Sequence, residues 1–268
     1  MLKPSSISKL IWGFSVVLCA TLFLFKEVSA YAQATNDGGV APDYNSCMAL
    51  ATSANAQQGL DYATQWMSQQ ENGAAIHCMA TARMNLGQFG EAADLITELA
   101  AVQPPEQLGR KAALLGQAGQ IWEQEGNLDK AIASYGESLK IDPQNPQVWK
   151  SRAIAYARQK QWNEVIQDLD FSHALDTKNV DTLVLRATAY RYVNLMDRAK
   201  TDIARALRLD PISVAAFLER GNIRSSQGDH QGAREDWTKV TALGPGTPQS
   251  GIAERNLQKL QELEASTN

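Results

Sequence analysis

The chain is poor in the residues on which catalytic and metal sites are built. Its 268 residues include only three cysteines and three histidines. None of His77, His173 and His230 has a partner at the spacing of a metal site or a catalytic triad. Glycine-rich phosphate loops, zinc patterns and paired catalytic carboxylates are absent as well. We therefore expect no catalytic residues, no metal and no cofactor, and we predict that the protein is not an enzyme.

An excess of positive charge is also missing. The formal net charge is −4. Removal of residues 1–32 would take away three lysines and one glutamate, and would make the chain more acidic. This balance argues against a general nucleic-acid binder and against binding to an anionic membrane surface.

Long hydrophobic runs are absent except near the start. Lys3 and Lys9 precede an uncharged, mostly apolar run over residues 10–25, and small residues suited to cleavage follow at Ala30, Ala32 and Ala34. The pattern predicts a signal peptide over residues 1–32 and export to the periplasm of a bacterium. The alternative is an uncleaved anchor that holds the protein on the inner membrane, facing the periplasm. The small, polar residues 33–42 are predicted to be a flexible tether.

The strongest pattern in the chain is a repeat of 34 residues. Similar stretches begin at this interval, at Ala131, Val165, Ala199 and Ala233. If these residues take repeat position 20, the repeats start at Ala112, Pro146, Val180 and Val214, and a further one starts upstream at Gly73. A period of this length is typical of helix pairs, which bury their apolar faces only by stacking on their neighbours.

The columns of these repeats resemble the tetratricopeptide repeat (TPR) family. Position 4 is large (Leu115, Trp149, Leu183, Phe217), position 8 is small (Gly119, Ala153, Ala187, Gly221), and position 24 is large (Tyr135, Leu169, Ile203, Trp237). The resemblance implies an all-α fold, a right-handed TPR superhelix (α-solenoid). The predicted organisation is a degenerate N-terminal helix pair, short in its second helix, at 43–72; repeats at 73–106, 112–145, 146–179, 180–213 and 214–247; an inter-repeat loop at 107–111; and a capping helix with a tail at 248–268. An extended first turn of the next helix is the alternative to the inter-repeat loop.

Two cysteines, Cys47 and Cys78, lie on the first helices of the two N-terminal units. In an oxidising compartment they are expected to form a disulfide, and closing a loop of about thirty residues would contribute roughly 3 to 4 kcal/mol on the chain-entropy model. One alternative is a pair of buried thiols. Another is a catalytic Cys78 activated by His77, but adjacent residues of a helix point in different directions.

Charged residues at repeat positions 7 and 23 change together along the chain. The last three repeats carry Arg at position 7 and Asp at position 23, as Arg152 with Asp168, Arg186 with Asp202, and Arg220 with Asp236. The earlier repeats carry neither charge. These positions lie at nearly the same height in an antiparallel helix pair, so we predict a structural ion pair within each repeat. The alternative is that these side chains only fill partly exposed faces.

In the TPR family the first helices line the concave face, and the ligand-facing positions transfer to residues that include Glu219 and Asn222. The residues expected to bind a partner are Lys150, Arg158, Leu185, Arg191 and Tyr192. The resemblance implies a monomeric scaffold of the bacterial cell envelope that binds a protein or peptide segment, with an acidic stretch or a C-terminal carboxylate favoured by the basic side chains. A groove with incidental solvated charges is the alternative. An accessory factor for pilus or outer-membrane assembly, or a regulator of a cell-wall enzyme, are the alternative functions.

Overall fold

The structure is a computed structural model that describes residues 43–69 and 72–267. The predicted signal peptide and tether, 1–32 and 33–42, lie outside the described residues. Within the described ranges every regular element is helical, which confirms the predicted all-α class. The helices are α2 (Tyr44–Ala51), α3 (Ala56–Gln69), α4 (Gly73–Asn85), α5 (Phe89–Ala101), α6 (Leu108–Glu125), α7 (Leu128–Ile141), α8 (Pro146–Arg158), α9 (Trp162–Leu175), α10 (Val180–Tyr192), α11 (Met196–Leu209), α12 (Val214–Ser226), α13 (His230–Leu243) and α14 (Pro248–Thr267), with a 3-10 turn, η1 (Pro105–Gln107), before α6.

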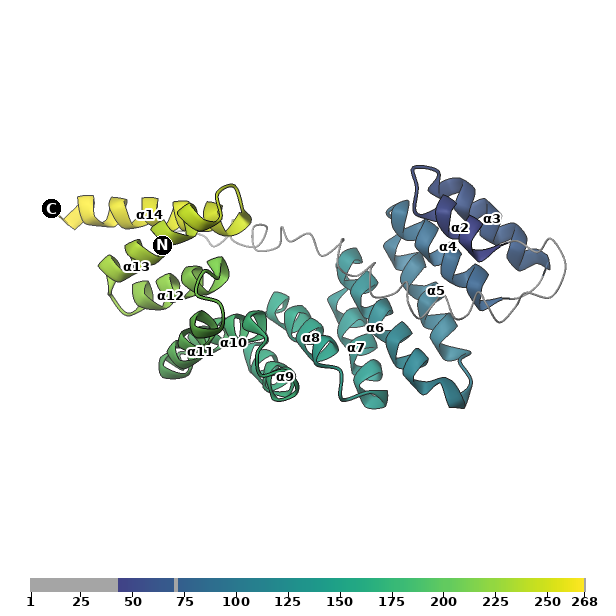
Figure 1. Cartoon of the computed structure of the whole chain (residues 1–268), viewed down its shortest axis with the longest axis horizontal. Helices are drawn as coiled ribbons and strands as arrows, with labels where there is room; N and C mark the ends of the chain where they lie inside the picture. Colours follow the sequence, from purple (N-terminus) through teal and green to yellow (C-terminus); the bar gives the residue numbers. More distant parts are fainter. Residues whose placement is uncertain (1–42, 70–71, 268) are drawn as a thin grey trace. The chain divides into compact units, whose positions relative to one another are not determined.

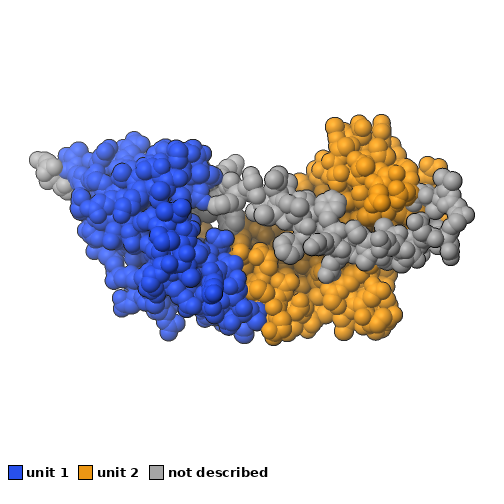
Figure 2. Space-filling view, in the orientation of Figure 1, with its two compact units in different colours: residues 1–15, 161–268 blue, residues 16–160 orange. Residues whose placement is uncertain are grey.

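The helices form two compact units, which are shown in different colours in Figure 2. Unit 1 contains α9 to α14, and the described part of unit 2 contains α2 to α8. Within each unit, successive helices pack against one another in chain order, as Figure 1 shows. Each unit is therefore a stack of helix pairs, the arrangement of an α-solenoid. None of the described helices combines the length and apolarity needed to span a bilayer.

The first helix of each later repeat begins where a side chain caps it. Asn145, Asn179 and Ser213 each accept a hydrogen bond from a backbone N–H of the following first turn, just before α8, α10 and α12. Such caps satisfy donors that a helix cannot satisfy internally. The repeat starts inferred from the sequence therefore coincide with the starts of these three helices.

In each of the five repeats, the turn between the two helices has a left-handed residue at position 15. Glycine occupies this position in three repeats, and its φ is between 76° and 86° at Gly87, Gly126 and Gly228. Lys160 and Asn194 take the same place with φ of 61° and 62°. Left-handed backbone costs a residue with a Cβ roughly 1–2 kcal/mol, and asparagine tolerates it better than lysine.

Close approach of the paired helices depends on complementary sizes at positions 8 and 24. A Cβ atom at Gly221 would lie 2.6 Å from the Trp237 ring, and one at Gly119 would lie 2.6 Å from the Tyr135 ring. Where position 8 is alanine, as at Ala187, the residue at position 24 is aliphatic. Glycine is thus found where an aromatic ring from the second helix needs the space.

Two predicted boundaries differ from the structure. Residues 108–111 are not a loop, because α6 begins at Leu108 and is 18 residues long. The extra residues of this repeat are absorbed by η1 and by the added first turn of α6. In the N-terminal pair the short helix is the first one, α2, with 8 residues, whereas α3 has 14. Thr52 and Ser53 donate side-chain hydrogen bonds to the last carbonyls of α2, and this competition with the backbone ends the helix.

The stack of unit 1 ends at α14, which lies in the segment predicted to be a capping helix. Pro248 follows Val214 by one period, so α14 continues the register of the first helices. It packs on α13, and a contact between Arg234 and Glu264 at 2.5 Å joins the two helices. The residues at its positions 7, 8 and 11, Glu254, Arg255 and Gln258, are charged or polar and exposed. In the earlier first helices, the residues at these positions face a second helix. A polar outer face of this kind closes a stack of repeats.

Candidate functional site

Side chains of α9, α10, α12, α13 and α14 in unit 1 form a continuous series of contacts, hereafter the contact series. It begins with Trp162 at the start of α9 and Tyr192 at the end of α10, whose rings stack with centroids 4.1 Å apart and planes 3° from parallel. The guanidinium carbon of Arg191 lies 4.7 Å from the Tyr192 ring centroid. Half of the Tyr192 surface, 49%, is exposed. The aromatic end of the series is therefore both rigidly held and accessible.

Arg191 connects this aromatic end to α12 through Glu219. The Nε atom of Arg191 lies 2.6 Å from Oε1 of Glu219, and one terminal nitrogen lies 3.2 Å from Oε2. The Glu219 side chain is only 6% exposed. Burial acts to lower the pKa of Arg191, but the charge and hydrogen bonds of Glu219 outweigh it and raise that pKa. The two side chains form a locked, neutral pair.

Amide groups extend the series from α12 to α14. Asn222 donates to the Glu219 carboxylate at 3.2 Å. Its carbonyl oxygen accepts from Trp237 Nε1 at 3.2 Å and from the Asn256 amide at 3.1 Å. The series therefore runs without a break from α9 to α14.

Unit 2 has a similar pair on its own first helices. Arg158 of α8 donates to the backbone carbonyl of Glu123 on α6 at 3.0 Å, and it lies 3.5 Å from the Glu123 carboxylate. The Tyr135 hydroxyl donates to the same carboxylate at 3.2 Å. Burial raises the pKa of Glu123, and the hydrogen bond from Tyr135 and the charge of Arg158 offset part of that shift. Lys150, also on α8, makes no ion pair within the described part of the chain.

These contacts revise the predicted basic site. Arg158 and Arg191 were expected to present positive charge to a ligand, but each is paired with a glutamate of a neighbouring first helix. The two pairs are 35 and 28 residues apart in sequence, and neither recurs at the same positions of other repeats, so a comparison of columns does not reveal them. Lys150 and Arg158 belong to unit 2, whereas Leu185, Arg191 and Tyr192 belong to unit 1. One surface that includes all five residues therefore stays a prediction.

Sequence reasoning missed two members of the contact series. Asn256 was treated only as part of a capping helix, although it follows Asn222 by one full period. That spacing could have indicated that the two asparagines occupy the same position on neighbouring first helices. Trp162 was also missed, because it lies at the start of a second helix, outside the positions compared.

The charge columns give direct contacts in unit 1. Arg186 binds Asp202 through two hydrogen bonds of 2.7 and 2.8 Å, and it also reaches Asp170 at 2.8 Å. Arg220 binds Asp236 at 2.9 and 2.7 Å. These contacts join α10 to α11 and α12 to α13.

Two further features concern the same columns. Arg224 stands at repeat position 11, where the three preceding repeats carry Trp122, Tyr156 and Tyr190, and it adds a hydrogen bond of 2.8 Å to Asp236. Arg152 and Asp168 lie in different units, so their predicted pairing stays a prediction.

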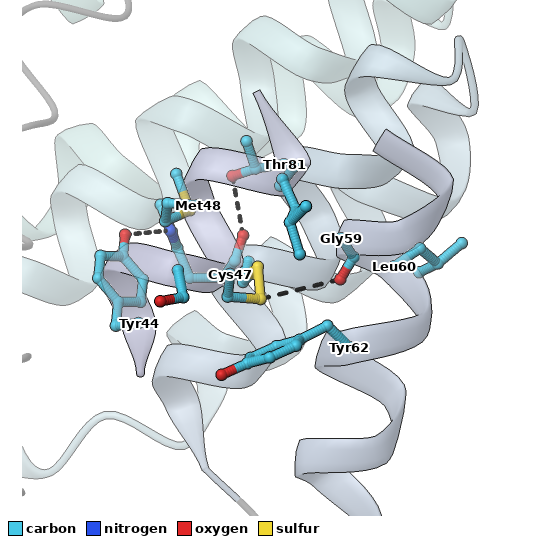
Figure 3. The surroundings of a disulfide bond; sticks show 12 residues. Tyr44, Cys47, Met48, Gly59, Leu60, Tyr62 and Thr81 are labelled. Atoms are coloured by element: carbon cyan, nitrogen blue, oxygen red, sulfur yellow. Dashed lines mark hydrogen bonds between the residues drawn. A yellow bond between two sulfur atoms is a disulfide. The ribbon is translucent and has the colours of Figure 1, made fainter. Parts of the chain in front are cut away.

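A disulfide joins Cys47 of α2 to Cys78 of α4, with the two Cα atoms 6.2 Å apart. Both residues are fully buried. Figure 3 shows Gly59 and Tyr62 beside Cys47. In this structure Cys78 carries no free thiol, which removes the basis for a nucleophile activated by His77.

His77 is adjacent to Cys78 on α4, and its contacts are those of a buried side chain that contributes to the fold. Its Nδ1 atom shares a hydrogen bond of 2.9 Å with the Tyr44 hydroxyl. Burial, and secondarily the positive charge of Arg110, lower the pKa of His77 to about 4. Among the described residues no group of three His, Cys, Asp or Glu side chains is arranged to hold a metal ion.

Known proteins resemble this chain in its repeats. Residues 119–160 match a family described as TPR repeat, and residues 184–248 match one described as Tetratricopeptide repeat. RNA polymerase II-associated protein 3 of Homo sapiens is 30% identical over 110 residues, which cover 41% of this chain and 16% of that protein. Protein O-mannosyl-transferase TMTC1 of Homo sapiens is 26% identical over 188 residues, which cover 67% of this chain and 20% of that protein. The chain thus spans a fifth or less of these two relatives.

Solved structures share the fold at low sequence identity. The C-terminal part of a TPR repeat-containing protein from Cytophaga hutchinsonii has a TM-score of 0.62 at 15% identity, covering 75% of this chain and 79% of that one. YrrB, described as a TPR protein with an unusual peptide-binding site, has a TM-score of 0.55 at 13% identity. The match covers 72% of this chain and 97% of YrrB. The family matches, the 34-residue register and the stacked helix pairs together identify the chain as one built from tetratricopeptide repeats.

Proposed function

We propose that the protein is a non-enzymatic scaffold that binds a protein or peptide segment along the first helices of unit 1. Proteins built from TPRs are generally scaffolds of this kind. The observation that carries the proposal is the contact series, which fixes side chains of α9, α10, α12 and α14 to one another before any partner arrives. A preorganised surface loses little conformational entropy on binding. Leu185 and the half-exposed Tyr192 offer apolar contact on the same helix, α10.

Site-specific photo-crosslinking tests this location. A photoreactive amino acid at Leu185 on α10 should capture the partner in the native host, and the same residue at Thr201, which is exposed on α11, should not. Capture from Thr201 alone would place the interaction on the second helices instead, and capture from both positions would show that it is not confined to the first helices.

We also propose that the protein works in an oxidising compartment outside the cytoplasm, the periplasm of a bacterium. The buried disulfide supports this, because such bonds persist in oxidising environments. The leader-like pattern of residues 1–32 agrees with it. The intact mass of the protein from its native host decides between the two forms of export. Loss of the first 30 to 34 residues indicates secretion, whereas a full-length species in the membrane fraction indicates an anchor.

A further inference from the structure

We infer that unit 1 recognises an uncharged, extended peptide segment, with a proline or aliphatic side chain on the Trp162–Tyr192 stack and the peptide main chain bonded to Asn256. This inference rests on the proposed function and names the chemistry of its partner. Three properties of the contact series support it: its neutral charge, its exposed aromatic end and its open amide end.

The charge of the series is satisfied internally. Glu219, whose side chain is 6% exposed, takes two of the five N–H donors of Arg191 and balances its charge. A ligand carboxylate that displaced Glu219 would leave a buried carboxylate without its partner, which is strongly unfavourable. One that bound the remaining donors would add a negative charge to a pair that is already neutral. Asn222 also donates to the Glu219 carboxylate. An acidic segment therefore gains little from Arg191, and an uncharged segment matches the neutral surface.

The aromatic end provides an apolar anchor of fixed shape. The ring of Tyr192 stacks on the parallel ring of Trp162 with centroids 4.1 Å apart, and the guanidinium carbon of Arg191 lies 4.7 Å from the Tyr192 centroid. Half of the Tyr192 surface is nevertheless open to solvent. Leu195, three residues further along, is 43% exposed and adds apolar surface to this end of α10. Extended peptides rich in proline dock on surfaces lined by aromatic rings, because the peptide is stiff and the rings are flat. A proline or aliphatic side chain therefore suits this end.

The amide end provides main-chain recognition. One N–H of Asn256 is used by Asn222. Its second N–H and its carbonyl oxygen have no hydrogen bond within the described residues. A side-chain amide with one donor and one acceptor matches the C=O and N–H of a peptide unit, whatever the peptide sequence. Asn256 can therefore hold an extended main chain without reading its side chains.

A peptide array tests this preference on the full-length, disulfide-bonded protein. The array contains end-blocked decapeptides of three classes: uncharged sequences with proline and leucine, the same sequences with four glutamates, and the same with four lysines. Uncharged peptides should bind best, and their affinity should change less than about twofold between about 50 and 500 mM salt, since no ion pair is formed. Tyr192→Ala should weaken binding about tenfold, which corresponds to the loss of an aromatic contact.

Matched variants separate recognition from folding. Phe171→Ala removes another aromatic side chain of unit 1, 55% exposed on α9, and should leave affinity unchanged. Tyr192→Phe keeps the ring and should bind like the wild type. If Tyr192→Ala loses helical circular dichroism, Trp162→Leu takes its place with the same expected loss of affinity.

The outcomes distinguish the two proposals. A preference for acidic peptides, or full affinity in folded Tyr192→Ala or Trp162→Leu, would overturn the inference and leave the proposed function standing. Failure of all three classes to bind, together with no crosslink from Leu185, would overturn both.

Discussion

Lys160 occupies a turn position at which three other described repeats carry glycine. Its φ of 61° lies in the left-handed region, which a lysine adopts at a cost. We expect Lys160→Gly to raise the free energy of unfolding by about 1 kcal/mol. Gln159→Gly is the control, because Gln159 has ordinary helical backbone (φ −87°), and there glycine should lower stability by roughly 0.5–1 kcal/mol. Equal effects of the two substitutions in urea unfolding would contradict the argument.

Gly221 tests the size complementarity between paired helices. Gly221→Ala would place a Cβ 2.6 Å from the Trp237 ring, and the overpacking should cost about 1–3 kcal/mol. The double variant with Trp237→Leu should recover part of this loss, as alanine is paired with an aliphatic residue in other repeats. Gly109→Ala on α6 serves as the control, since a Cβ there meets nothing within 4 Å. A destabilising Gly109→Ala would show that the cost is not a matter of packing.

His77 makes the stability of unit 2 depend on pH. Its folded-state pKa of about 4 lies below the ordinary histidine value of 6.5, so the unfolded chain binds the proton more readily. Its contribution is therefore fully present above about pH 6.5, is lost as the pH falls towards 4, and amounts to about 3 kcal/mol over that range. The difference in unfolding free energy between pH 7.5 and 4.5 should shrink in His77→Gln. An unchanged difference would mean that His77 is not buried as a neutral ring.

At the scale of the elements, the Arg186 contacts predict an asymmetric double-mutant cycle between α10 and α11. Arg186→Met strands Asp202, whose side chain is 8% exposed, and should cost roughly 3–5 kcal/mol. Asp202→Asn should cost less, because Arg186 keeps Asp170. The double variant should be less destabilised than the sum of the two single variants. Strict additivity in chemical unfolding would show that the two charges are not energetically coupled.

The period of the sequence predicted the helix pairs well, because periodicity reports which residues are buried in every repeat. The starts of α8, α10 and α12 followed from it directly. Contacts that occur in only one pair of repeats could not be predicted in this way. Arg191 with Glu219 is such a contact, made once, between residues that no other repeat shares. The start of α6 was missed because the five additional residues before Ala112 could lengthen either a loop or a helix, and the period does not distinguish them.

At the scale of the whole molecule, the disulfide should determine how firmly the N-terminal pair is held. Protein prepared under oxidising conditions should show Cys47 and Cys78 unlabelled by a thiol reagent after denaturation without reductant. Replacing both with alanine should lower the unfolding free energy by about 3–4 kcal/mol on the chain-entropy model. Amide exchange should increase first in α2 and α3, which the bond ties to α4. Two labelled thiols, or an equal increase of exchange in α14, would contradict this expectation.

The outer face of α14 has a consequence for assembly. In the 34-residue period, α14 corresponds to the first helix of a further repeat. Charged and polar side chains on its outer face, Glu254, Arg255 and Gln258 among them, oppose the packing of a second helix there. With apolar and small residues at those positions, the last helix would expose an apolar face with no helix packed on it. Copies of such a chain would gain free energy by associating at this face and could grow into filaments, so these polar side chains oppose self-association through α14.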